Sequence, residues 1–544
     1  MDTGVLPARL VARDERPDHV SWRLDVHLVF WGSSLLLAAA AMVRNGLLFT
    51  QAQYPSSDAA LNSLLVHRAE HFEQLVGNYS RVGFNHPGPV LLYFLAAGQA
   101  IFHDLLHVVP AQYNGQELGA IVYVAVFVGL TMVSMYRLTR SRGATAISFG
   151  IVFIFAASNH LIGNTWFPYL YIPAFLLFMV TGAAVAAGRT VEVPLFVLSA
   201  AVLVHGHVSF LMFVGVTALA VLGGWWHQNR MHWRAEWAAH RRGLQWAMVL
   251  ICVAALPIAV ETVVHYPGQW PLYLHFVEHG QHAPRTGHQI LNFLGVYWGR
   301  PLGLPTLLGV VAGIVALVLT GTERNRERRP IFVALYGMVL LQSLLMLYYV
   351  ARGVDQLTRV NVYVGYFYLT VPLLLVATAA AQLWIRVVEG AGDRRLVLPR
   401  SMRAPSAALL SAVLVVLGAS SVHLDIGSAP HKELPGIVTS LRAQPARGDR
   451  MIEFELDDHD TWPAVAGVAA ESLRVGLSWC VQPGSDGGWQ VLFSRTYTCR
   501  STGRPRWIVH CITGPTPPSG AHVIWSGFVG RTRMTMYDLG PPAI

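Results

Sequence analysis

Long apolar runs separated by short polar segments dominate the first 420 residues of the chain. Eleven of these runs approach the length of about 20 residues that a helix needs to cross a bilayer. The pattern therefore predicts a polytopic α-helical membrane protein. Its expected spans are 25–43, 117–136, 144–158, 169–187, 193–205, 207–226, 244–263, 302–320, 331–350, 360–385 and 405–422.

The distribution of arginine predicts how these spans are oriented. If the N-terminus lies inside, the inside segments hold 21 of the 39 Lys and Arg residues, and the outside segments before residue 423 hold only 7. This asymmetry follows the positive-inside rule. We therefore expect an integral protein of the plasma (inner) membrane with a cytoplasmic N-terminus. Because eleven is odd, the C-terminal region is expected to be extracytoplasmic.

Composition excludes several classes of protein. Charged residues make up 13% of the 544-residue chain, about half the share in an ordinary soluble domain, and hydrophobic residues make up 53%. These values exclude a purely cytosolic enzyme and a disordered chain. The net charge of +9 is explained by the inside loops, so no nucleic-acid partner is expected. No phosphate-binding loop, dinucleotide fingerprint, G-x-S-x-G or C-x-x-C motif supports nucleotide or redox chemistry.

The last part of the chain has a different pattern. Short β-like runs at 473–481, 489–494, 507–512, 522–525 and 534–537 alternate with turn-rich pieces, and 462–474 has a helical pattern. We predict a transmembrane domain over 1–422 followed by a small external α+β domain over 423–544. In an oxidising compartment its cysteines, Cys480, Cys499 and Cys511, predict one disulfide. We favour Cys480 with Cys499, although the sequence leaves the pairing open.

The longest outside loop, 44–116, contains two predicted helices. Ser56, Ser57 and Asp58 are typical of a helix start, and apolar residues then recur at helical spacing as far as Val76. A later apolar stretch, Val90–Phe102, is too short to span a bilayer. We expect it to lie in or on the outer leaflet.

This loop resembles that of the GT-C glycosyltransferases, membrane enzymes that use lipid-phosphate-linked sugars. In that superfamily the first external loop carries two juxtamembrane helices, an acidic residue shortly after the first span, and a Pro-rich turn before the second helix. Asp58 and the turn His86-Pro87-Gly88-Pro89 occupy these places here. The likeness covers residues 25–140 and is greatest to PMT-like actinobacterial members with a C-terminal external domain. Unlike the usual pattern, Gly88 separates the prolines and no second acidic residue adjoins Asp58.

The resemblance implies transfer of a sugar from a polyprenyl-phosphate donor to an envelope glycan, glycolipid or protein on the outer face, with inversion. Asp58 would be the base that takes the proton of the acceptor hydroxyl. The alternative is that Asp58 only stabilises a helix N-terminus. No cofactor is expected to be required, and a divalent metal has no support in the sequence.

Arginine is the suitable partner for the lipid phosphate because its planar guanidinium group can donate two parallel hydrogen bonds to phosphate oxygens. Candidates outside the membrane are Arg352 and Arg359, between the ninth and tenth spans, and Arg81 before the Pro-rich turn. Interfacial anchoring is the alternative role for these arginines.

Three histidines are predicted to contact the substrate. His86 belongs to the Pro-rich turn, and His205 and His207 lie at the outer turn between the fifth and sixth spans. Polar residues at the rim of a membrane domain are often functional. The alternative is a hydrated turn.

Other functions fit the sequence less well. A flippase or transporter of lipid-linked sugars predicts polar residues that face a midplane cavity, but the spans are strongly apolar. A non-catalytic envelope assembly factor would bind a partner through the external domain. The segment His275-Phe-Val-Glu278-His279 matches a metallopeptidase zinc motif, although 23 histidines make a chance match unsurprising.

Overall fold

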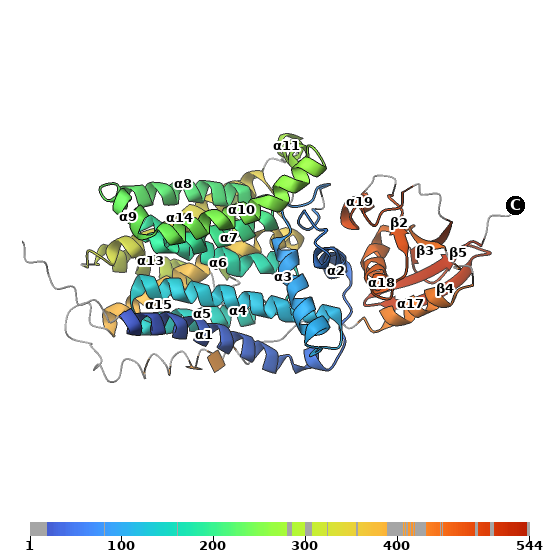
Figure 1. Ribbon diagram of the computed structural model, residues 1–544, viewed down its shortest axis with the longest axis horizontal. Helices are drawn as coiled ribbons and strands as arrows, with labels where there is room; N and C mark the ends of the chain where they lie inside the picture. The colour runs from blue at the N-terminus through green and yellow to red at the C-terminus, as the bar shows by residue number, and fades with distance from the viewer. Residues whose placement is uncertain are drawn as a thin grey trace, which may run out of the picture.

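The computed structural model describes residues 19–80, 82–159, 161–279, 285–299, 307–323, 325–354, 357–388 and 431–540, with short gaps at 446–447, 449, 485–487 and 501–504, and isolated residues between 406 and 418. A helical bundle and a smaller C-terminal domain lie end to end (Figure 1). The C-terminal domain contains all the strands in the described part of the chain.

The bundle contains membrane-length helices. Within the described residues, seven helical segments are long and apolar enough to cross a membrane: Leu24–Arg44, Gln112–Thr139, Phe167–Ala186, Phe210–Asn229, Arg241–Val264, Arg329–Arg352 and Asn361–Val387. Four apolar helices are shorter: Val90–Leu105, Arg142–Ser158, Thr190–Gly206 and Val311–Gly321. The predicted fold class, a polytopic helical membrane protein with a small α+β domain, is confirmed. The number of eleven spans stays a prediction, since most of 405–422 lies outside the described residues.

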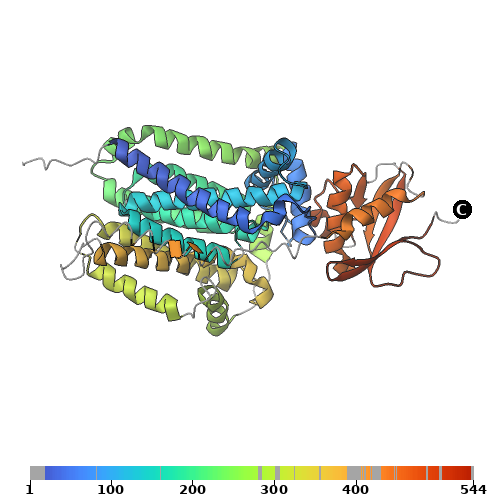
Figure 2. The same ribbon diagram turned by 90° about the horizontal axis from the view of Figure 1, so that it is seen from below.

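The helices of the bundle pack around α6, which is apolar on every side and mostly buried, as expected for a helix at the centre of a bundle. Figure 2 shows the same bundle from below. Its elements are α1 (His19–Arg44), η1 (Gly46–Phe49), α2 (Ser57–Glu70), α3 (Val90–Gln99), η2 (Ala100–Leu105), α4 (Gln112–Thr139), α5 (Arg142–Ser158), α6 (Phe167–Ala186), η3 (Thr190–Glu192), α7 (Val193–Gly206), α8 (Phe210–Asn229), α9 (Trp233–Ala239), α10 (Arg241–Val264), α11 (Trp270–His279), α12 (Gly287–Gly299), α13 (Leu307–Gly321), α14 (Arg329–Arg352), η4 (Arg359–Leu369) and α15 (Thr370–Val387).

One expected span is not a uniform α-helix. The segment predicted as 360–385 begins with the 3-10 helix η4, is bent at Gly365, and becomes α-helical only at Thr370. The Tyr297 side chain fills the bend, since its hydroxyl donates to the Val362 carbonyl at 2.8 Å and lies 2.4 Å from where a Cβ on Gly365 would be. Tertiary packing, which the apolar pattern cannot report, therefore shapes this segment.

The C-terminal domain is a five-stranded mixed sheet with helices. The strand order is β2-β1-β3-β5-β4; β1 pairs in parallel with β2 and β3, and the other pairs are antiparallel. Its elements are α17 (Glu433–Ala443), β1 (Met451–Leu456), η6 (His459–Thr461), α18 (Trp462–Arg474), β2 (Trp479–Val481), α19 (Gly488–Leu492), β3 (Arg506–Thr513), β4 (His522–Val529) and β5 (Thr532–Asp538). The crossover between parallel β1 and β2 is the helix α18, as such a connection requires.

Two details of this domain differ from the expected pattern. The prediction of a β-like run at 489–494 is wrong, because residues 488–492 form the short helix α19. Strand β1 was missed, although apolar Ile452 and Phe454 alternate with Glu453 in the sequence, as in a strand. All three side chains are buried.

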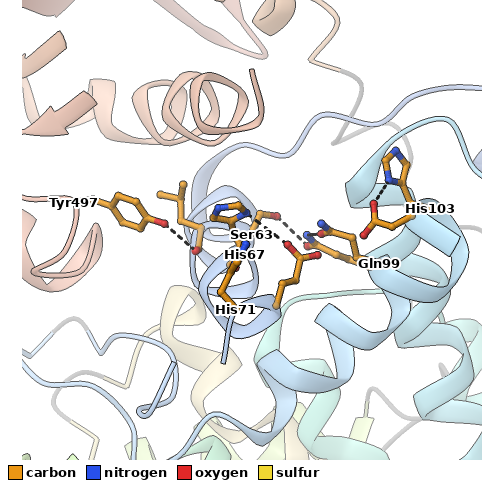
Figure 3. Close-up of polar contacts among 10 residues, drawn as sticks. Ser63, His67, His71, Gln99, His103 and Tyr497 are labelled. Carbon is orange, nitrogen blue, oxygen red and sulfur yellow. Dashed lines mark hydrogen bonds and ion pairs between the residues drawn. The ribbon is translucent and has the colours of Figure 1, made fainter. Parts of the chain in front are cut away.

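Helix α2 is held from two sides. On the C-terminal side, Ala60, Leu61 and Leu64 share a buried cluster with residues of α18, and the Tyr497 hydroxyl donates to the Leu64 carbonyl at 3.4 Å. On the bundle side, the Ser63 hydroxyl donates to Gln116 of α4 at 2.9 Å (Figure 3). The two packed faces fix the position of α2 between the bundle and the C-terminal domain.

Candidate active site

A cavity of about 750 Å³ opens at the end of the bundle that carries α2 and α11. Most of its wall is apolar and aromatic, with a few polar groups, which is the usual character of a ligand site. The aromatic residues of the wall include Trp166, Tyr171, Trp270, Tyr273, Phe276, Tyr349 and Tyr363. The polar residues include Asp58, Asn62, Asn78, Tyr79, His86 and His207.

Asp58 reaches the cavity from the first turn of α2. The Tyr79 hydroxyl donates a hydrogen bond to its carboxylate. Tyr79 is itself 7% exposed and belongs to the buried cluster of the C-terminal domain. The carboxylate therefore lies at the cavity wall in an orientation to which a packed tyrosine contributes.

The Pro-rich turn is clamped onto the end of α7. The Gly88 N–H donates to the His205 carbonyl at 3.1 Å, and a Cβ on Gly88 would lie 2.2 Å from Nδ1 of the same histidine. Only glycine allows this approach, which gives a physical reason for the residue that separates Pro87 from Pro89. On its other edge, the His205 ring contacts the Ala254 carbonyl through Nε2 at 2.8 Å. His205 is not one of the described residues that line the cavity; its ring packs behind the turn.

This clamp brings His86 and His207 together at the cavity wall, with their ring centroids 4.1 Å apart. The Nδ1 atoms accept from backbone N–H groups, His86 from Val208 at 3.4 Å and His207 from Ser209 at 3.2 Å. Each neutral ring then carries its proton on Nε2.

Both histidines resist protonation. Burial, with a smaller contribution from a charge on His207, holds the pKa of His86 well below its usual value. Burial lowers the pKa of His207 to about 4. At neutral pH the pair is therefore uncharged and can donate hydrogen bonds.

The arginines chosen from the sequence are not gathered at the described cavity wall. Arg352 ends α14 with an exposed side chain, directly before Gly353 and Val354, which do line the cavity. Arg81 and the side chain of Arg359 lie outside the described part of the chain.

Sequence reasoning missed Arg285. Its guanidinium donates to the Val350 carbonyl, close to Tyr349 at the cavity wall, and its Nη2 atom is buried without a hydrogen-bond partner among the described residues. The signal was present, because Arg285 is one of two arginines in the outside segment 264–301.

Cys480 and Cys499 form a disulfide that joins β2 to the segment before β3. Cys511 is buried within the sheet, and Cys252 is exposed on α10. The histidine-rich motif of 275–279 does not form a metal-binding group among the described residues: His275 and Glu278 are exposed on α11, and the two groups with suitable spacing lie in the C-terminal domain.

The sequence matches no protein-family model and no curated protein. Among solved structures it is similar to ArnT from Cupriavidus metallidurans bound to undecaprenyl phosphate, with 14% identity and a TM-score of 0.54 over 95% of this chain and 98% of that chain. ArnT in the apo state gives 13% identity and a TM-score of 0.51, over 95% and 97% of the two chains. ArnT is a GT-C glycosyltransferase, so the resemblance predicted from the first outside loop is confirmed in the fold. The chain therefore has an ArnT-like fold along nearly its whole length.

Proposed function

We propose that this protein is a membrane glycosyltransferase that moves a sugar from a polyprenyl-phosphate donor to an envelope glycan, glycolipid or protein, with inversion. The observation that carries the proposal is Asp58, which lines a large aromatic cavity in a chain with the ArnT-like fold. The same fold in ArnT holds undecaprenyl phosphate, which supports a polyprenyl-phosphate partner here.

Asp58 acts as the general base in this proposal. The acceptor oxygen attacks the anomeric carbon from the face opposite the phosphate, and the bond from that carbon to the phosphate oxygen breaks. The lipid phosphate leaves with the bonding electrons, and Asp58 takes the proton of the acceptor hydroxyl. A positioned base of this kind contributes about 10²- to 10⁴-fold to the rate.

Cationic and N–H groups stabilise the leaving phosphate in this proposal. Arg352, Arg359 and Arg81 remain candidates, and the buried, partly unpartnered guanidinium of Arg285 joins them. The Nε2–H groups of His86 and His207, which line the cavity, can add neutral hydrogen bonds. None of these groups requires a cofactor.

The reaction takes place on the outer face in this proposal. The low number of arginines in the segments that carry the cavity supports this orientation under the positive-inside rule. The C-terminal domain is then extracytoplasmic and covers α2, where it can guide the acceptor.

The test is incorporation of label from polyprenyl-phosphate sugars by membranes that contain the wild type or Asp58→Asn. Asp104→Asn is the matched control, because Asp104 is an exposed carboxylate of the same loop and bonds to His103. We expect loss of transfer by a factor of about 10² or more in Asp58→Asn, with normal transfer in Asp104→Asn. Equal transfer by all three proteins rejects Asp58 as the base, and no transfer by a folded wild type favours a transporter or an assembly factor.

A further inference from the structure

The side-chain amides of two asparagines at the cavity wall lack hydrogen-bond partners among the described residues. Asn62 is 3% exposed, and its Oδ1 atom is buried without a partner among the described residues; the Oδ1 atom of Asn78 is in the same state. Neither Nδ2 atom donates a hydrogen bond to a described residue. Both asparagines line the cavity.

Native proteins seldom leave buried amides unsatisfied, because an unmade hydrogen bond in the interior is unfavourable. Asn114 shows the ordinary solution in this chain. It is fully buried, its Oδ1 accepts from the Gln53 N–H at 2.9 Å, and its Nδ2 donates to the Leu48 and Gln51 carbonyls, each at 2.8 Å. Asn62 and Asn78 therefore differ from a structural asparagine.

The two amides are placed beside the proposed base. Asn62 follows Asp58 by four residues on α2, so the two side chains lie one above the other on one face of the helix. Asn78 precedes Tyr79, which donates to the Asp58 carboxylate. A group that reacts at Asp58 would bring its neighbouring atoms towards these amides.

We infer that Asn62 and Asn78 form a recognition subsite for uncharged hydroxyl groups of the sugar that lies next to Asp58. A side-chain amide has both a donor group and an acceptor atom, and so does a hydroxyl. No described residue fixes which end of either amide faces the cavity. The inference rests on the proposed function. The hydroxyls can belong to the donor sugar or to an acceptor sugar.

The experiment compares purified full-length wild type with Asn62→Leu and Asn78→Leu, in which an apolar side chain also branched at Cγ replaces the amide. The thermal unfolding of each protein is measured without ligand, with polyprenyl phosphate, with polyprenyl-phosphate hexose, and with a hexose oligosaccharide. Transfer kinetics then give KM for the donor and for the oligosaccharide. Asn114→Leu is the control for a structural asparagine.

We expect both variants to unfold at or above the wild-type midpoint, because an unpartnered buried amide is replaced by an apolar group. Asn114→Leu should unfold at a lower midpoint or fail to fold. In the two variants the extra stabilisation that a sugar-bearing ligand gives should disappear, and the matching KM should rise by about 10-fold or more. Loss with polyprenyl-phosphate hexose assigns the subsite to the donor sugar, and loss with the oligosaccharide assigns it to the acceptor.

Unchanged stabilisation by both sugar-bearing ligands overturns the inference, and so does a midpoint that falls as in Asn114→Leu. The stabilisation arm does not depend on turnover, so it separates this result from failure of the proposed function. If the proposed function fails, either Asp58→Asn transfers as the wild type does or the folded wild type transfers no sugar, whatever the asparagine variants do.

Discussion

The Tyr79 hydroxyl donates a hydrogen bond to the Asp58 carboxylate across a separation of 21 residues. Tyr79 is packed in the cluster of the C-terminal domain, whereas Asp58 faces the cavity. The relationship connects the proposed base to a part of the molecule that lies outside the membrane bundle.

Replacing Tyr79 by Phe should slow transfer more than it weakens binding. The ring keeps its packing, but the carboxylate loses a donor that orients it, so we expect kcat to fall by about 10-fold or more with little change in KM. Steady-state kinetics with a polyprenyl-phosphate sugar measure this split. Tyr266→Phe, at an 84% exposed position, is the control and should behave as the wild type. A rise in KM alone would show that Tyr79 contacts substrate.

Gly88→Ala should destabilise the Pro-rich turn. The new Cβ would lie 2.2 Å from the His205 ring, and a clash of this kind costs about 1–3 kcal/mol. Thermal unfolding should show the loss, and His205→Ala should remove most of it in a double-mutant cycle. Gly295→Ala on α12 is the control, since nothing lies within 4 Å of a Cβ there. Additive effects of Gly88→Ala and His205→Ala would contradict the clamp.

The buried histidines should make the protein less stable in acid. Burial lowers the pKa of His207 to about 4, so between the unfolded value of 6.5 and this value the unfolded chain binds more protons than the folded protein. Stability is then fully present above pH 6.5 and falls as the pH is lowered towards 4. From pH 7 to pH 5 the free energy of unfolding should decrease by about 2 kcal/mol through His207 alone.

His207→Phe tests this assignment, because it keeps an aromatic ring of similar size. Denaturant unfolding at pH 7, 6 and 5 should show a shallower pH dependence in the variant. His232→Phe, on an exposed histidine directly before α9, is the control. Parallel slopes for all three proteins would place the titrating group elsewhere.

Arg285→Gln should weaken binding of the lipid phosphate. The buried Nη2 atom has no protein partner among the described residues, so an anionic ligand is its natural partner. We expect the Kd for polyprenyl phosphate to rise by about 10-fold or more, measured by thermal stabilisation. Arg326→Gln, in the polar segment between α13 and α14, is the matched control. If both variants bind alike, Arg285 serves only to hold the end of α14.

The apolar pattern predicted the class of fold because each long run has one stable solution in a bilayer, a helix. The same pattern could not report the bend at Gly365, which depends on Tyr297 from another helix. Asp58 was identifiable as an acid at a predicted helix start, in the place where the resemblance of the first outside loop implies the base.

Other features of the site depend on contacts between distant segments. His86 and His207 meet only because Gly88 packs on His205, and nothing local in the sequence separates the histidine at the cavity wall from the one behind it. Asn62 and Asn78 were overlooked for the same reason, since an unpartnered amide is recognisable only when its neighbours are known.

The position of α2 has a consequence for biosynthesis. One face of this helix is covered by α18, and Ser56 at its start contacts His431, 375 positions later in the chain, at 2.7 Å. The first loop is synthesised long before the C-terminal domain that covers it. One apolar face of the loop therefore stays exposed until the last quarter of the polypeptide has been synthesised. A nascent chain that stops short of the C-terminal domain is therefore an incomplete and aggregation-prone product, and activity should appear only with the finished molecule.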